Sequence, residues 1–204
     1  MKRVAPFVAL ILVLGRAASA FAADPRYPDW PCNQIKVPEL SVAAIWTGPP
    51  IDDVGDTWER DPQIKDLVVR LAARRTPLDD AEKAIGDFLA ANAADKQTRA
   101  KLLFAGLFAT LNRERTVVMN GIERFAQRRA LVADRIKSEA RQMRELQDAP
   151  NRDESKVNEL TNSIEWDTRV FEDQRKTIRY VCEVPIIIER RLGALARAIQ
   201  QSIE

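Results

Sequence analysis

Cys32 and Cys182 are the only thiols in this chain of 204 residues, which contains no histidine. Without histidine the chain lacks the usual general base, the imidazole metal ligand and any Ser–His or Cys–His nucleophilic pair. The two cysteines also lack the C-x-x-C spacing of redox-active or haem-binding thiols. In an exported chain an even cysteine count indicates a disulfide, and closing a loop of about 150 residues would stabilise the fold by roughly 4–5 kcal/mol.

Asp52, Asp53 and Asp56 form the one acidic cluster in a non-helical part of the sequence. Carboxylates can perform acid–base chemistry or bind calcium, but this spacing differs from that of an EF-hand and suits a polar turn. The sequence also contains no P-loop, dinucleotide-binding or G-x-S-x-G motif. We therefore expect no enzyme activity, no catalytic or metal-binding residue and no cofactor.

The N-terminal residues have the pattern of a secretory signal peptide. Lys2 and Arg3 precede an apolar stretch at 4–14 that is too short to span a bilayer, and small residues follow at 18–22. We expect cleavage after Ala20 or Ala22 and a periplasmic or secreted protein with no stable membrane span afterwards; the alternative is an uncleaved anchor. After removal of 1–22, 29 of the 32 basic residues remain beside 30 acidic ones, so we expect no nucleic-acid partner.

Residues 23–57 differ from the rest of the chain because they combine prolines with large apolar side chains. The prolines exclude a continuous helix, and the apolar residues exclude a free linker. We expect an extended strap laid along the helices, with one helical turn capped by Ser41. Its tryptophans, which include Trp30 and Trp46, either anchor the strap to the protein's own core, which we favour, or form a recognition surface.

Residues 58–204 have the composition of a helical domain, and we assign the chain to the all-α class. Two short amphipathic helices are predicted at about 61–75 and 77–92. Thr76 suits the N-cap of the second helix, and Pro77 suits its first position. We expect these helices to pack at the open end of a longer helical hairpin, forming a four-helix body there.

Two long apolar seams, with alternating steps of three and four residues, flank a break at 148–151. The first seam consists of Phe104, Phe108, Leu111, Arg115, Val118, Ile122, Phe125, Arg129, Val132, Ile136, Glu139, Met143 and Leu146. The second consists of Val157, Leu160, Ile164, Asp167, Phe171, Gln174, Ile178, Val181, Pro185, Ile188, Leu192, Leu195 and Ile199. We predict a long antiparallel coiled-coil hairpin with arms at about 95–147 and 151–203, the second arm being kinked at Pro185.

A turn centred near residue 148 predicts that facing positions have residue numbers that sum to 296. Phe125 then faces Phe171, and Arg129 faces Asp167, which predicts a buried ion pair that fixes the register. Arg115 falls beside Cys182 in this register. Its guanidinium then needs a carboxylate or backbone acceptors nearby, because a buried charge without partners is costly.

These features favour an exported, non-enzymatic helical protein that acts through protein–protein contacts in the cell envelope, as a scaffold, adaptor or chaperone-like subunit. The partner is another envelope protein or a second copy of the chain. The expected contact surface is the hairpin tip, with Arg141, Arg144, Glu145, Arg152, Asp153 and Glu154, or a groove beside the seam. The alternative is a periplasmic small-molecule-binding or sensor protein with a pocket at the base of the hairpin, near Phe104, Phe108 and Trp46.

Overall fold

The computed structural model describes residues 24–204, so the predicted signal peptide at 1–22 lies outside the described part. The described chain is mainly helical and contains no strand, and two long helical segments pack together, as predicted. The five α-helices are α1 (Pro62–Ala72), α2 (Leu78–Ala91), α3 (Lys96–Asp148), α4 (Glu154–Val181) and α5 (Val184–Ile203). Three single turns of 3-10 helix are η1 (Val42–Ala44), η2 (Thr57–Arg60) and η3 (Ala93–Asp95).

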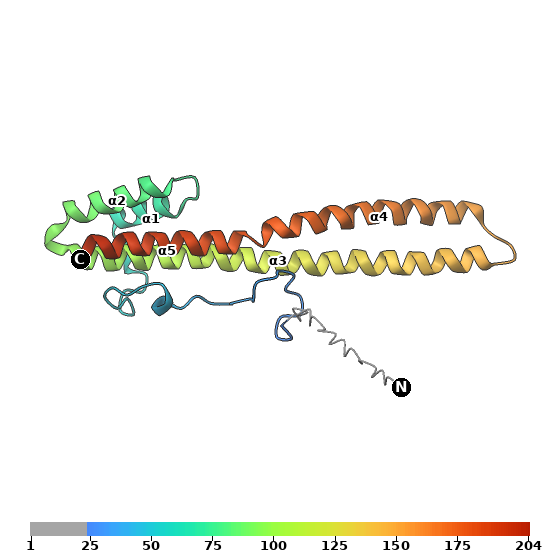
Figure 1. Ribbon diagram of the computed structural model, residues 1–204, viewed down its shortest axis with the longest axis horizontal. Helices are drawn as coiled ribbons and strands as arrows, with labels where there is room; N and C mark the ends of the chain where they lie inside the picture. Colours follow the sequence, from blue (N-terminus) through green and yellow to red (C-terminus); the bar gives the residue numbers. More distant parts are fainter. Residues whose placement is uncertain (1–23) are drawn as a thin grey trace, which may run out of the picture.

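The molecule is elongated along α3, as Figure 1 shows. After the connection at 149–153, α4 and then α5 run back alongside α3, so that the C-terminus lies near the start of α3. At that end α1 and α2 lie on one side of α3 and α5, and the segment 24–56 lies on the other side. We call the four-helix end the body and the segment 24–56 the strap.

Local sequence explains where α1 and α4 begin. Asp61 caps α1 by accepting hydrogen bonds from the backbone N–H groups of Gln63 and Ile64, and Pro62 follows as the first helical residue. Asp153 caps α4 in the same way. Thr76 does not cap α2 as predicted: its hydroxyl donates to the carbonyl of Arg70 at 2.8 Å, near the end of α1. It therefore satisfies a helix C-terminus instead.

The predicted second arm is divided into two helices, not one kinked helix. α4 ends at Val181, α5 begins at Val184, and Pro185 falls in the first turn of α5. Proline is well tolerated there because the N–H that it lacks would have no partner within the helix. The break lets α5 take a direction of its own against α3, where Ile188 is fully buried.

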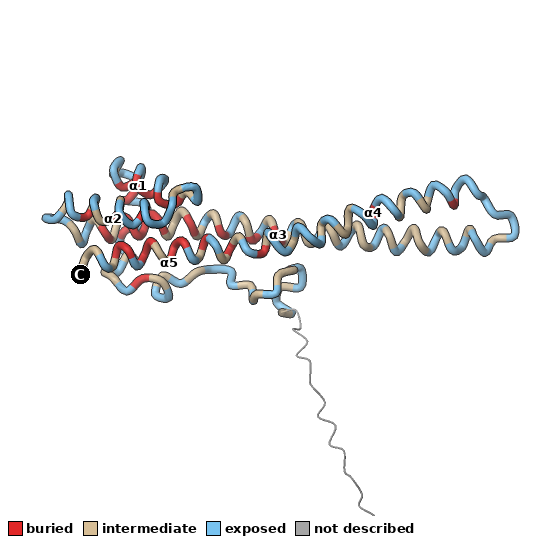
Figure 2. Tube along the Cα trace, turned by 45° about the horizontal axis from the view of Figure 1, so that its top comes forward, coloured by how far each residue is buried: buried red, intermediate tan, exposed pale blue. Residues whose placement is uncertain are grey.

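The hydrophobic core lies in the body and includes part of the strap (Figure 2). Trp46 of the strap stacks on Phe104 of α3, with ring centroids 4.2 Å apart and planes 7° from parallel. Trp58 packs with Val68 against Gly106 of α3. Burying an aromatic ring contributes a few kcal/mol, so the strap tryptophans anchor it to the core, as we favoured from the sequence.

Beyond Ile122 the structure narrows to two helices, and we call this part the distal arm: 123–148 of α3, the connection at 149–153 and 154–178 of α4. Figure 2 shows that the arm is mostly exposed or half-buried. Only Val157 and Asp167 are buried within it. The arm therefore contributes little to the hydrophobic core.

Contacts between α3 and α4 run in opposite order along the two helices. Met143 meets Thr161, Arg135 meets Asp167, and Arg129 lies over Phe171. The residue numbers of these pairs sum to between 300 and 304, about one heptad beyond the predicted 296. A shift of one heptad keeps apolar positions opposite apolar positions, so the seam pattern alone could not exclude it.

Candidate functional site

Cys32 and Cys182 lie at disulfide distance, with Cα atoms 5.6 Å apart. Cys182 follows the last residue of α4, so the pair joins the strap to the break between α4 and α5. Around it, Trp30 packs with Met119 and Ile122 of α3 in a second small apolar cluster. The strap is thus fixed at the point where the body ends and the distal arm begins.

Arg115 lies under the strap and is only 2% exposed. Its guanidinium pairs with Glu189 of α5 and donates to the carbonyls of Val37 at 2.6 Å and Pro38 at 3.3 Å. These are the carboxylate and backbone acceptors that the sequence predicts for a buried arginine. The side chain thereby links three elements: α3, α5 and the strap.

The predicted Arg129–Asp167 ion pair is wrong. Asp167 is bound by Arg135, whose Nη2 lies 2.6 Å from Oδ1 and whose Nε contacts Oδ2. Arg129 instead lies over the ring of Phe171, 3.9 Å from its centroid, and its buried Nε has no hydrogen-bond partner. The physical reason is the heptad shift, which moves Asp167 along α3 toward Arg135. Hydrogen bonding to Asp167 raises the pKa of Arg135 above its ordinary value, so the guanidinium stays protonated.

The distal arm carries two large apolar side chains that are exposed to solvent. Leu131 of α3 is 69% exposed and Trp166 of α4 is 63% exposed. Val170, one helical turn beyond Trp166, is half-buried. Single exposed apolar residues are normal on a protein surface, whereas a contiguous exposed apolar patch marks an interaction surface. The sequence pattern held a signal for both residues, because they fall outside the seams, but we did not single them out.

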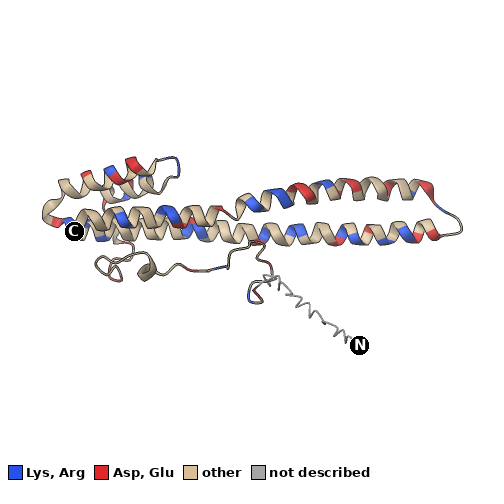
Figure 3. Ribbon diagram, in the orientation of Figure 1, with Lys and Arg blue, Asp and Glu red and all other residues tan. Residues whose placement is uncertain are grey.

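The six predicted contact residues all lie at or near the tip of the arm and are exposed. Arg141, Arg144 and Glu145 are in the last two turns of α3. The other three all have structural partners: Arg152 pairs with Glu154 at 2.9 Å, and Asp153 caps α4 through the N–H of Lys156. Figure 3 shows mixed charges at this tip, with acidic residues at the start of α4.

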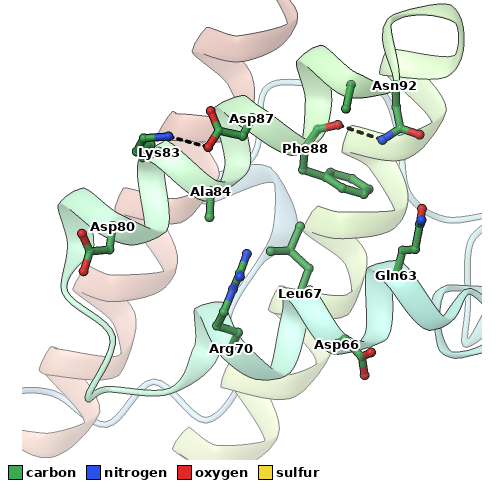
Figure 4. A pocket seen from close by; sticks show the side chains of 11 residues that line it. Gln63, Asp66, Leu67, Arg70, Asp80, Lys83, Ala84, Asp87, Phe88 and Asn92 are labelled. Carbon is green, nitrogen blue, oxygen red and sulfur yellow. Dashed lines mark hydrogen bonds and ion pairs between the residues drawn. The ribbon is translucent and has the colours of Figure 1, made fainter.

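The pocket expected near Phe104, Phe108 and Trp46 is largely filled, because the first and last of these rings stack on each other and are buried. Phe108 lines a separate hollow of about 460 Å³ between the strap and α3. A larger hollow of about 660 Å³ lies between α1 and α2, where Leu67 and Arg70 point toward Ala84 and Phe88 (Figure 4).

The larger hollow differs from a typical ligand site. Charges of both signs surround the larger one, including the ion pair of Lys83 with Asp87 at 2.6 Å. A ligand site usually combines an apolar enclosure with a few convergent polar groups. In the acidic cluster Asp53 pairs with Lys101 at 2.5 Å, and residues 24–204 contain no group of metal-binding side chains.

Within the same residues, no helix is both long and apolar enough to cross a membrane. Comparison of the chain with known proteins gives no significant match to a family model, a curated protein or a solved structure.

Proposed function

We propose that this chain is an exported, non-enzymatic protein that acts through protein–protein contacts in the cell envelope. In this proposal α3 and α4 form an antiparallel coiled-coil hairpin, and its distal arm is the contact element. The protein serves as a scaffold, adaptor or chaperone-like subunit, held by its body and strap while the arm engages its partner.

The observation that carries the proposal is the exposure of Leu131 and Trp166 on an arm that is not needed for the core. At about 1.5 Å per residue, the 26 arm residues of α3 extend roughly 40 Å beyond the body. Over that length only two residues are buried. A helical pair this thin gains little stability for its length, so selection for contact with another protein is the simplest reason for its large exposed side chains.

Export is supported by two independent features. The pattern at 1–22 is that of a signal peptide. Cys32 and Cys182, far apart in sequence, lie at disulfide distance, and such bonds persist in oxidising compartments outside the cytosol.

Site-specific photo-cross-linking in living cells tests the proposal. A photoreactive amino acid placed at position 131, 166 or 144 of the arm should yield a covalent protein adduct. The matched control is position 69 on α1, where Val69 is similarly exposed at 62% but lies on the body. Adducts from the control alone, or from none of the arm positions, would contradict the proposal.

A further inference from the structure

We infer that the partner of the distal arm is a second copy of this chain, packed antiparallel against the side that carries Leu131 and Trp166. This inference rests on the proposed function, because it names the partner of the same arm. It follows from which side of the arm is uncovered, from the size of that side and from its charges.

The uncovered side of α3 continues the side that α1 and α2 cover in the body. Glu114 of α3 faces the α1–α2 connection, where Arg74 pairs with it at 3.4 Å. Arg128 and Arg135 follow Glu114 at multiples of seven residues, so in a coiled-coil pair they lie on the same side of α3. Leu131 lies between them, three residues after the first and four before the second.

The corresponding side of α4 carries Trp166. Arg135 reaches Asp167 from the uncovered side. Ser163 and Val170 each lie one helical turn from Asp167, so they share its uncovered side of α4. Trp166 lies one turn from both Ser163 and Val170 and therefore also belongs to this side, farther from the contact with α3. Among residues 24–204 no other helix covers this side of the arm, although two helices cover the same side of the body. Leu131 and Trp166 stay more than half exposed there, and only the neighbouring Arg169 lies over the Trp166 ring, 5.8 Å from its centroid.

The uncovered side is large enough for a stable dimer. Two helices packed 8–10 Å apart present a surface roughly 18 Å wide, and the arm is roughly 40 Å long. Each copy would then bury about 700 Å², or about 1,400 Å² in total, which lies within the usual range for specific interfaces. A second arm would also extend the four-helix packing of the body along the whole molecule.

The charges on this side complement themselves when two copies run antiparallel. Arg124, Leu131, Ser138 and Glu145 recur every seven residues along α3. A two-fold axis between Leu131 and Ser138 places Arg124 opposite Glu145 of the second copy, and this pair occurs twice. The Arg135 side chains of the two copies lie near each other at the axis, and Asp167 of the same copy neutralises each guanidinium.

The ends of the proposed dimer would bring charged residues of the two copies together. The tip of one arm would reach the α1–α2 connection of the other copy, which in Figure 1 points toward the arm. That connection carries exposed Arg74 and Arg75. The tip carries Asp148, Asp153 and Glu154 beside the basic residues Arg144, Arg152 and Lys156.

Sedimentation equilibrium of the purified full chain tests the inference. We expect a dimer that dissociates on dilution. Trp166→Glu should weaken it at least about thirtyfold, since truncating a buried interfacial tryptophan commonly has that effect. The matched control is Ile35→Glu on the strap, where Ile35 is 74% exposed and lies outside the proposed interface. It should leave the dimer unchanged.

A charge exchange tests the antiparallel alignment. Arg124→Glu and Glu145→Arg should each weaken the dimer, because each places like charges opposite one another. The double variant should restore wild-type dimerisation. Failure of the double variant to recover, with both single variants weakened, would overturn this alignment. Circular dichroism confirms that each variant is folded.

A monomer at every concentration would overturn the inference. Adducts of the arm with a different protein in the photo-cross-linking experiment would then leave the proposed function standing. A monomer without any arm adduct would overturn both. A dimer insensitive to Trp166→Glu would place self-association elsewhere and overturn the inference as well.

Discussion

Replacing Gly106 by alanine should destabilise the protein, even though alanine normally favours a helix. Gly106 lies inside α3 where η2 and α1 approach closest. A Cβ atom there would lie 2.7 Å from Cγ2 of Val68 and 2.8 Å from Cε3 of Trp58. Both neighbours are stiff, a β-branched side chain and an indole, so relief requires α1 or η2 to shift. Overpacking of this kind costs about 1–3 kcal/mol.

Gly121 provides a matched control on the same helix. A Cβ atom added there meets only the guanidinium of Arg124, at 3.9 Å. Gly121→Ala should therefore stabilise the protein by about 0.5–1 kcal/mol, the usual helix-propensity gain. The same gain applies to Gly106→Ala and offsets part of its overpacking, leaving a net loss of up to about 2 kcal/mol.

Urea unfolding followed by far-UV circular dichroism measures both free energies, and tryptophan fluorescence reports the surroundings of Trp58. The two variants should move in opposite directions from wild type. A Gly106→Ala variant as stable as Gly121→Ala would refute the close packing of α1 and η2 on α3.

Three further predictions concern the strap and its contacts. Replacing Cys32 and Cys182 together by alanine should lower the free energy of unfolding by about 5 kcal/mol in the chain-entropy model. The stability of this variant should not change when a reductant is added. A wild-type protein that is equally stable with and without reductant would contradict the prediction. Arg115→Met should cost about 2–4 kcal/mol in thermal or urea unfolding, because it leaves strap carbonyls and a carboxylate without their donor. Hydrogen bonding to Lys101 lowers the pKa of Asp53. The stabilisation of the folded state by this carboxylate is therefore present above the unfolded pKa of about 3.8 and is lost as the pH falls through the lower native pKa. NMR titration should show that the native pKa of Asp53 rises in the Lys101→Met variant.

The helices could be predicted because their apolar spacing and end signals agree over long stretches. Asp61-Pro62 and the break before Asp153 each mark a helix start through local chemistry alone. The register of α3 against α4 could not be predicted, because a heptad repeat is nearly unchanged by a shift of one repeat. Only the length of the connection at 149–153 distinguishes the two registers, and helix ends are uncertain by a residue or two from sequence.

The candidate site was predictable in part for a similar reason. The cysteine pairing followed from an even count, and the need of Arg115 for partners followed from burial. The identity of those partners depended on where the strap runs, and no periodicity constrains a proline-rich segment. Asp167 pairs with Arg135 and not with Arg129 because of the register of α4 against α3. Trp166 and Leu131 could be recognised as candidate contact residues only from the structure, because it shows that α1 and α2 do not extend over them.

The positions of Cys32 and Cys182 also bear on how the chain matures. The bridge spans 150 residues of the sequence. During synthesis the first cysteine therefore emerges long before its partner exists. Until then it is a free thiol, open to attack by other thiols or by an oxidant. Correct maturation thus depends on a thiol-exchange catalyst, or on slow oxidation, acting after the chain has been made at least as far as Cys182.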